Sequence, residues 1–270
     1  MKIHHLRNAT FVIESGRRYF LIDPMLSRKG QLPPFSYFRH RLQRNPVVEL
    51  PENAPEILKK VTHCIVTHSQ KWGIELLTHT DHLDGSGKKF LREKQLPVFC
   101  LEEDAGYMRN NGIVVERELS YWQSENISGG KIIAIPARHG HSWVHHFMAN
   151  GAGIYLELKD EPSIYISGDT VYTDDVRNAL TNLKPDISVV AAGSAGLDVG
   201  GHILMSLEEI LTFIETAPGK VVANHLEALN HCPTTRKELI DELEKRNLMS
   251  KTFIPDDGDV ISFEKGYYGS

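Results

Sequence analysis

The chain of 270 residues has no hydrophobic run as long as the roughly 18 residues that a membrane helix needs. Aspartate and glutamate outnumber lysine and arginine by 35 to 30, so the net charge is −5 and no basic excess favours nucleic acid. The three cysteines, Cys64, Cys100 and Cys232, are far apart without a C-x-x-C pair, which disfavours a disulfide framework. The N-terminus has no apolar signal-peptide core, so we expect a cytoplasmic protein with no membrane or nucleic-acid partner.

What the sequence does contain is an alternation of short apolar runs and amphipathic segments. Runs at 2–6, 10–14 and 18–22 predict an antiparallel meander, because a serine–glycine pair that suits a hairpin turn joins the last two. Strands and helices then alternate from about residue 55 in both halves of the chain, with no linker between them. We therefore predict one α/β (α+β) domain that spans 1–270.

The later elements follow from hydrophobic periodicity. Strands are expected at 64–67, 97–100, 131–135, 153–158, 163–167, 187–191, 220–223, 252–254 and 260–263. Helices are expected at 86–95, 102–110, 173–182, 206–215 and 233–246. The segment 24–55 has no such pattern and carries several arginines, which is typical of a lid, a binding loop or an oligomer contact; a solvated surface is the alternative.

A cluster of metal-binding residue types lies just before the helix expected at 86–95. His79, Asp81 and His82 place two imidazoles and a carboxylate within four residues, and these ligands suit zinc, manganese or iron. The alternative is a polar turn in which Asp81 or Asp84 caps the helix.

Four other predicted strands end close to a histidine or an aspartate. These residues are His68, His139, Asp169 and His225. His139 opens a group of four histidines within 139–146, and all four cannot bind one ion because neighbours in an extended segment point to opposite faces. Each residue alone could be a hydrogen-bonded structural side chain. Together they predict a metal centre at one rim of the sheets, where α/β proteins place their sites.

These motifs resemble the metallo-β-lactamase superfamily of metal-dependent hydrolases. The family pattern is H-x-H-x-D-H, then a lone histidine, an aspartate in a Gly-Asp-Thr context and a final histidine, and it is similar to residues 78–82, His139, 168–170 and His225. The segments 200–205 and 225–236 are also similar to the branch that contains the L-ascorbate-6-phosphate lactonase. The resemblance implies a four-layer αββα sandwich with the metals at one edge.

The resemblance also implies a ligand set for two divalent cations, zinc in the first place and manganese as the alternative. His79 and His139 would bind one metal, Asp81, His82 and His225 the other, and Asp169 would bridge them. The first histidine of the motif departs from the pattern, because its place is taken by Leu77. Either His68 is that ligand and 69–78 holds an insertion, or the first site is incomplete and the protein binds one metal or binds metal weakly.

Other residues are expected to act around this centre. Asp81 is the expected catalytic residue, placed to accept or return a proton. Asp23, Asp84 and Glu227 are expected to orient the ligand histidines by accepting a ring N–H. His231, Arg236 and His202 are expected to bind the substrate, the first two near a helix start that favours anions.

The leading functional prediction is hydrolysis of a small ester, lactone or phosphoester, on an anionic small molecule, by a metal-activated water. One alternative is a nuclease or phosphodiesterase of the same fold, which the net charge disfavours. Another is a non-catalytic metal-binding module, which the interrupted first motif keeps open. A homo-oligomer is also left open.

Overall fold

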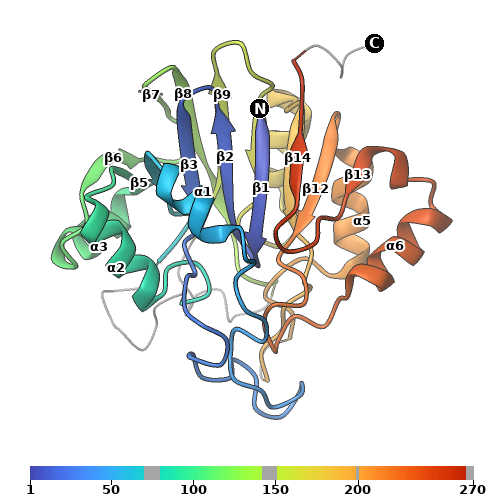
Figure 1. Ribbon diagram of the computed structural model, residues 1–270. Coiled ribbons are helices and arrows are strands. Elements are labelled where there is room, and N and C mark those ends of the chain that lie inside the picture. The colour runs from blue at the N-terminus through green and yellow to red at the C-terminus, as the bar shows by residue number, and fades with distance from the viewer. Residues whose placement is uncertain (70–79, 142–150, 199–200, 266–270) are drawn as a thin grey trace.

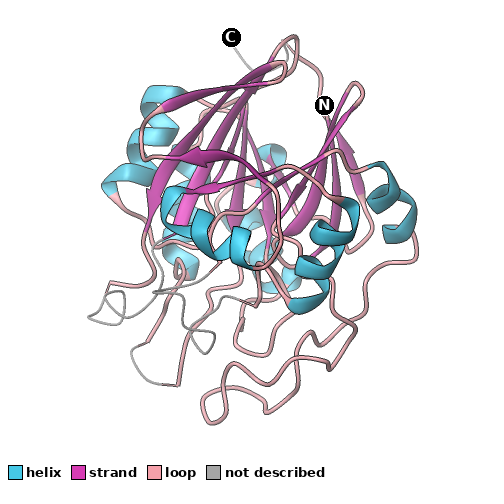
Figure 2. Ribbon diagram, turned by 90° about the vertical axis from the view of Figure 1, so that its left-hand side faces the viewer, coloured by secondary structure: helices cyan, strands magenta, loops and turns pink. Residues whose placement is uncertain are grey.

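The computed structural model describes residues 1–69, 80–141, 151–198 and 201–265 (Figure 1). Two seven-stranded sheets face each other, and helices cover their outer faces (Figure 2). The strand orders are β14-β1-β2-β3-β4-β5-β6 and β13-β12-β11-β10-β9-β8-β7. This is the predicted four-layer αββα arrangement, the metallo-β-lactamase fold.

The first sheet combines an antiparallel meander with a parallel extension. Its strands are β1 (Lys2–Arg7), β2 (Thr10–Ser15), β3 (Arg18–Ile22), β4 (His63–Ile65), β5 (Val98–Leu101), β6 (Val115–Leu119) and β14 (Val260–Ser262). The strands β14, β1, β2 and β3 pair antiparallel, whereas β3, β4, β5 and β6 pair parallel. The helices of this half are α1 (Ala54–Lys60), α2 (Gly85–Lys94) and α3 (Glu102–Asn110).

The second sheet has the same mixed character. Its strands are β7 (Ser124–Ile127), β8 (Gly130–Ala137), β9 (Gly151–Leu158), β10 (Ile164–Ile166), β11 (Ile187–Ala191), β12 (Lys220–Asn224) and β13 (Thr252–Phe253). The strands β7 to β10 pair antiparallel in sequence order, and β10 to β13 pair parallel. Its helices are α4 (Asp174–Asn178), η3 (Ala179–Leu183), α5 (Leu207–Thr216), α6 (Arg236–Lys245) and η4 (Met249–Lys251).

Alternation along the strands divides the core into layers. Phe11 of β2 and Val189 of β11 belong to one apolar cluster between the sheets. Their neighbours Val12 and Val190 point the other way, into two separate clusters beneath the outer helices. Successive side chains of a strand face opposite sides, so both sheets are buried on both faces.

Four elements were missed by the periodicity argument, among them the short helix η4. The strands β6 and β7 are polar and half exposed at a sheet edge, so they have no apolar alternation to detect. Helix α1 was not predicted, although Pro55 occupies a position typical of a helix start. Helix α6 begins at Arg236, three residues later than expected, because the Thr235 side chain caps it by accepting from the Glu238 N–H.

The irregular segment 24–53 lies at the lower end of the molecule in Figure 1, drawn in blue. Two side chains from the second half of the chain hold it. The Asn230 amide accepts from the Phe35 N–H at 2.9 Å and donates to the Ser36 carbonyl at 2.7 Å. The Asp198 carboxylate accepts from the Ser36 hydroxyl at 2.5 Å and from the Tyr37 N–H at 2.7 Å. The segment is therefore tied to the loops that follow β11 and β12.

Among the described residues, every helix is too short or too polar to cross a lipid bilayer.

Candidate metal centre

The predicted ligands occupy turns at one end of the two sheets. His68 follows β4, His139 follows β8, Asp169 follows β10 and His225 follows β12 directly. The turn that contains Asp81 and His82 leads into α2. His79 and the predicted insertion at 69–78, apart from residue 69, lie outside the described residues.

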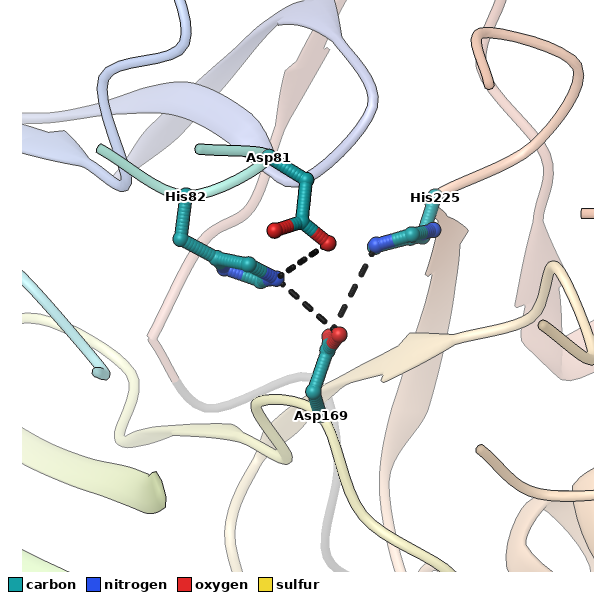
Figure 3. A group of neighbouring side chains, drawn as sticks. All are labelled: Asp81, His82, Asp169 and His225. Atoms are coloured by element: carbon teal, nitrogen blue, oxygen red, sulfur yellow. Dashed lines mark ion pairs between the residues drawn. The ribbon is translucent and has the colours of Figure 1, made fainter. Parts of the chain in front are cut away.

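Four of these side chains converge from three different turns (Figure 3). Asp81, His82, Asp169 and His225 each offer one ligand atom, and these atoms lie within 4.8 Å of one another. His82 Nε2 is 3.0 Å from Asp169 Oδ2 and 3.7 Å from Asp81 Oδ2. His225 Nε2 is 3.7 Å from Asp169 Oδ1. This group matches the second ligand set implied by the resemblance.

A second group shares Asp169 with the first. His68, His139 and Asp169 also place one ligand atom each within 4.8 Å of one another. His139 Nε2 is 3.9 Å from Asp169 Oδ2, and the His68 ring centroid is 4.9 Å from that of His139. Both groups therefore share Asp169. His68, which is one of the two alternatives for the first histidine of the motif, belongs to the second group.

The donor atoms of the first group fit a cation. His82 and His225 are fully buried and Asp169 is 2% exposed. Within the described part of the chain, no hydrogen bond reaches His225 Nε2 or Asp169 Oδ1. Buried polar atoms without such partners are costly, and imidazole nitrogens with carboxylate oxygens are the ligands of zinc and manganese.

One carboxylate orients histidines of both groups. Asp23 Oδ2 accepts from His82 Nδ1 at 2.8 Å and from the Thr67 hydroxyl at 2.8 Å. The Thr67 oxygen then accepts from His68 Nδ1, at 3.0 Å. A carboxylate can only accept, so both rings carry their proton on Nδ1 and direct Nε2 to the centre. Asp23 thus has the orienting role expected for it.

The electrostatics of the first group favour positive charge. Burial by itself would lower the pKa of His82, but Asp169, Asp23 and Asp81 outweigh burial and raise that pKa well above its ordinary value. Burial would likewise raise the pKa of Asp169, but His82 and His225 outweigh it and hold that pKa well below its ordinary value. A divalent cation would meet the same field as the His82 proton and would replace that proton.

The turn between β1 and β2 connects two ligand-bearing segments. The Asn8 side-chain amide donates to the Asp81 carbonyl at 3.1 Å, and the Asn8 carbonyl accepts from the His225 N–H at 3.0 Å. Asn8 and His225 both have positive φ, at 56° and 61°. Asparagine tolerates this conformation better than most residues, so its use at the turn is understandable.

Gly168 precedes Asp169 at a point where the chain packs closely on a neighbouring strand. Its φ is +61°, and an added Cβ would lie 2.5 Å from the Ala152 carbonyl oxygen of the neighbouring strand. The glycine therefore permits close packing of backbone on backbone.

The expected role of Arg236 in anion binding is wrong. Its guanidinium donates to Glu227 at 2.8 Å, to Asp257 at 2.9 Å and to the Pro255 carbonyl at 3.0 Å. These partners offset its charge and occupy its N–H donors. The same bond accounts for Glu227, which pairs with Arg236 and does not orient a ligand histidine.

Asp84 is also corrected. Its carboxylate accepts from the backbone N–H groups of Ser27 and Gly87, both at 2.7 Å, and so caps α2. Helix capping was the alternative that the sequence left open for this turn.

The two remaining substrate candidates differ in character. His231 is 3% exposed and packs edge-to-face on Phe35, with the ring centroids 5.3 Å apart. Burial lowers its pKa to about 4, although Asp81 opposes the shift, so its ring is neutral at pH 7 and cannot attract an anion by charge. His202 is exposed, and its Nδ1 lies 3.2 Å from the Ser194 carbonyl.

Three supporting residues escaped the sequence argument. Thr67 and Asn8 act through the hydrogen bonds described above, and Cys232 Sγ lies 3.5 Å from His225 Nδ1. Burial, with smaller effects of Asp169 and Asp81, raises the pKa of the Cys232 thiol well above its ordinary value. In the sequence, the signal for Cys232 is its place in a His-Cys-Pro run, seven residues after His225.

Comparison with known proteins gives consistent matches over the chain. Residues 18–225 match the beta-lactamase superfamily domain. The UPF0173 protein YddR of Bacillus subtilis is 31% identical over 267 residues, which are 97% of this chain and 100% of that protein. A UPF0173 metal-dependent hydrolase of Thermococcus onnurineus is 27% identical over 83% of this chain and 84% of its own length. The crystal structure of isothiocyanate hydrolase from Delia radicum gut bacteria superimposes with a TM-score of 0.85 at 32% identity, covering 97% of this chain and 99% of that one.

Proposed function

The chain belongs to the metallo-β-lactamase superfamily and to its UPF0173 family of metal-dependent hydrolases, and we propose that it hydrolyses a small ester, lactone or phosphoester. The observation that carries the proposal is the pair of ligand groups that share Asp169. Such sharing suits two cations bound side by side, and zinc is the proposed metal with manganese as the alternative.

Six described residues would hold the cations. Asp81, His82, His225 and Asp169 form the first site, and His68, His139 and Asp169 form the second, for which His79 is the further ligand predicted from the sequence. When bound, the cations would lower the pKa of a water molecule toward neutrality and polarise the bond under attack.

The residues of the chain divide the remaining work. The Asp23 carboxylate keeps protons on Nδ1 of His82 and, through Thr67, of His68. Asp81, which is 9% exposed, is the proposed acceptor and donor of the proton that leaves the attacking water and returns to the departing group. Burial of the other ligand side chains excludes bulk water and strengthens the electrostatic interactions in the site.

The substrate is proposed to be a small anion, as the sequence suggested. With Arg236 engaged by acidic partners, we propose that cations of the segment 24–53 attract the substrate; one of them, Arg39, lies near Gly196 in the loop after β11. Membership of the lactonase branch and assembly into a homo-oligomer both stay predictions.

The test is an activity panel of lactones, carboxylic esters and phosphodiesters, run on protein loaded with zinc or with manganese. We expect turnover of at least one class, about two equivalents of metal per chain, and loss of turnover in Asp169→Asn. Asp241→Asn on the exposed side of α6 is the matched control. Metal-replete protein that turns over none of these classes would contradict the proposal.

A second candidate is hydrolysis of isothiocyanates, whose central carbon is attacked readily by an activated water. It is favoured by the 32% identity with the isothiocyanate hydrolase over 97% of this chain. One alkyl and one aryl isothiocyanate belong in the same panel. A catalytic efficiency at least tenfold above that for every ester would make this candidate the better one.

A further inference from the structure

Cys232 lies between two buried imidazoles. Its sulfur is 3.5 Å from Nδ1 of His225 and 3.9 Å from Nδ1 of His231. His225 is fully buried, His231 is 3% exposed and Cys232 is 8% exposed. Gly193 leaves room for the thiol, because a Cβ at that position would lie 3.1 Å from the sulfur.

The two ring nitrogens of His225 face different partners. Nε2 is directed to Asp169, in the group of four ligand atoms, and Nδ1 is directed to the sulfur. A neutral imidazole has one N–H donor and one bare acceptor nitrogen. If Nε2 binds a cation, the ring proton must be on Nδ1, where the sulfur is the neighbour that can accept it.

A thiol can accept one hydrogen bond and donate another. If the sulfur accepts from His225, its own proton is available to His231, whose facing atom is again Nδ1. His231 must then carry its proton on Nε2. The orientation of one sulfur therefore determines the tautomers of both rings.

We propose that Cys232 is a positioning residue. Its sulfur accepts a hydrogen bond from the Nδ1–H of His225, and its S–H donates a hydrogen bond to Nδ1 of His231. The bare Nε2 of His225 is thereby held ready for a cation, and His231 presents an N–H at Nε2. The inference rests on the proposed function only in taking His225 as a metal ligand.

The first experiment observes the tautomers directly. Long-range ¹H–¹⁵N spectra are recorded on zinc-loaded protein labelled with ¹⁵N-histidine. We expect an Nδ1 proton on His225 that exchanges slowly with water, and an Nε2 proton on His231. In Cys232→Ala the His225 proton should exchange at least tenfold faster and His231 should become a mixture of tautomers. An Nδ1 proton on His231 in the wild type, or unchanged spectra in the variant, would overturn the proposal.

The second experiment measures zinc affinity by competition with a chelator. Cys232→Ala should weaken one zinc equivalent by about 10- to 100-fold and leave the other unchanged. Cys232→Ser keeps an acceptor and should recover part of the loss. Cys100→Ala, which removes a buried thiol from the outer core, is the matched control and should change neither equivalent.

Cobalt substitution separates positioning from direct ligation. A thiolate bound to cobalt gives a strong near-ultraviolet charge-transfer band, and we expect none that depends on Cys232. A band lost in Cys232→Ser would make the sulfur a ligand and overturn the proposal. None of these readouts requires turnover, so failure to find a hydrolysed substrate would be distinguished from failure of this inference.

Discussion

His82 lies near one oxygen of Asp169 on the side of the first sheet, and His225, which follows β12 of the second sheet, lies near the other oxygen. The chain holds the two rings in different ways. Behind His82 is the Asp23 carboxylate, which also accepts from the Thr67 hydroxyl and from the Thr67 N–H, each at 2.8 Å. Behind His225 is a neutral thiol at 3.5 Å. Charged acceptors form hydrogen bonds roughly twice as strong as neutral ones, so the ligands near the first sheet are fixed more firmly.

Replacing Asp23 should give the largest effect. In Asp23→Asn the amide loses the charge and one acceptor, which leaves a buried His82 poorly paired and costs about 3–5 kcal/mol of unfolding free energy. Both zinc equivalents should weaken, because Asp23 orients histidines of both groups. Urea unfolding of the metal-free protein and zinc titration measure the two effects. If Asp23→Asn loses no more zinc affinity than Cys232→Ala, then His82 and His225 are held equally firmly.

A change at Thr67 distinguishes the two ligand groups, because the Thr67 hydroxyl links Asp23 to His68. Thr67→Val keeps the shape but removes the hydroxyl between Asp23 and His68, which we expect to cost about 1–3 kcal/mol. One zinc equivalent, the one that uses His68, should weaken more than the other. Thr67→Ser should restore both quantities. Equal weakening of the two equivalents in titration calorimetry would show that the hydroxyl does not act through His68.

The pH dependence of stability tests the charge around His82. Its folded pKa is raised, so in the metal-free protein this group stabilises the fold fully below the unfolded value of 6.5 and loses that contribution as pH rises through the folded pKa. Asp169 has a lowered folded pKa, and its contribution is lost only in acid, below the unfolded value of 3.8. Denaturation of metal-free protein from pH 6 to 9 should show stability falling, with a smaller slope in Asp23→Asn.

Zinc should reverse this trend, because binding releases the proton from His82 and therefore tightens as pH rises. A metal-free protein whose stability is flat from pH 6 to 9 would show that the carboxylates do not hold a proton on His82.

The smallest effect is expected at Glu227, which pairs with Arg236 and supports neither His82 nor His225. Glu227→Gln weakens only a partly exposed pair with Arg236, so unfolding free energy should change by about 0.5 kcal/mol or less. Zinc affinity should match that of the wild type in the same chelator assay. A weakened zinc equivalent would return Glu227 to the role that the sequence assigned to it.

The ligand-bearing turns could be predicted because each strand end has a local signal. Apolar runs end shortly before His139, Asp169 and His225. The strands β8, β10 and β12 run in the same direction, so these ends lie at one rim of the sheet. The polar strands β6 and β7 give no such signal, since edge strands with exposed side chains do not alternate.

The residues that orient the ligands were harder to predict, because their partners are distant in sequence. Asp23 contacts His82 across 59 residues, and nothing near Glu227 in the sequence shows that its carboxylate pairs with Arg236. For Asp84 the sequence left helix capping open as an alternative but could not choose it. Composition identifies which side chains could accept a proton, and packing decides which of them do.

The hairpin turn at Asn8 has a consequence for which parts of the chain the metal centre needs. Asn8 supplies no atom to either ligand group, yet its amide and carbonyl set the spacing between the Asp81 turn and the His225 turn. A truncation that removes the opening hairpin would keep every ligand in the chain and still leave these two turns without their common support. We therefore expect assembly of the metal centre to depend on the hairpin that carries Asn8, although this hairpin contributes no ligand.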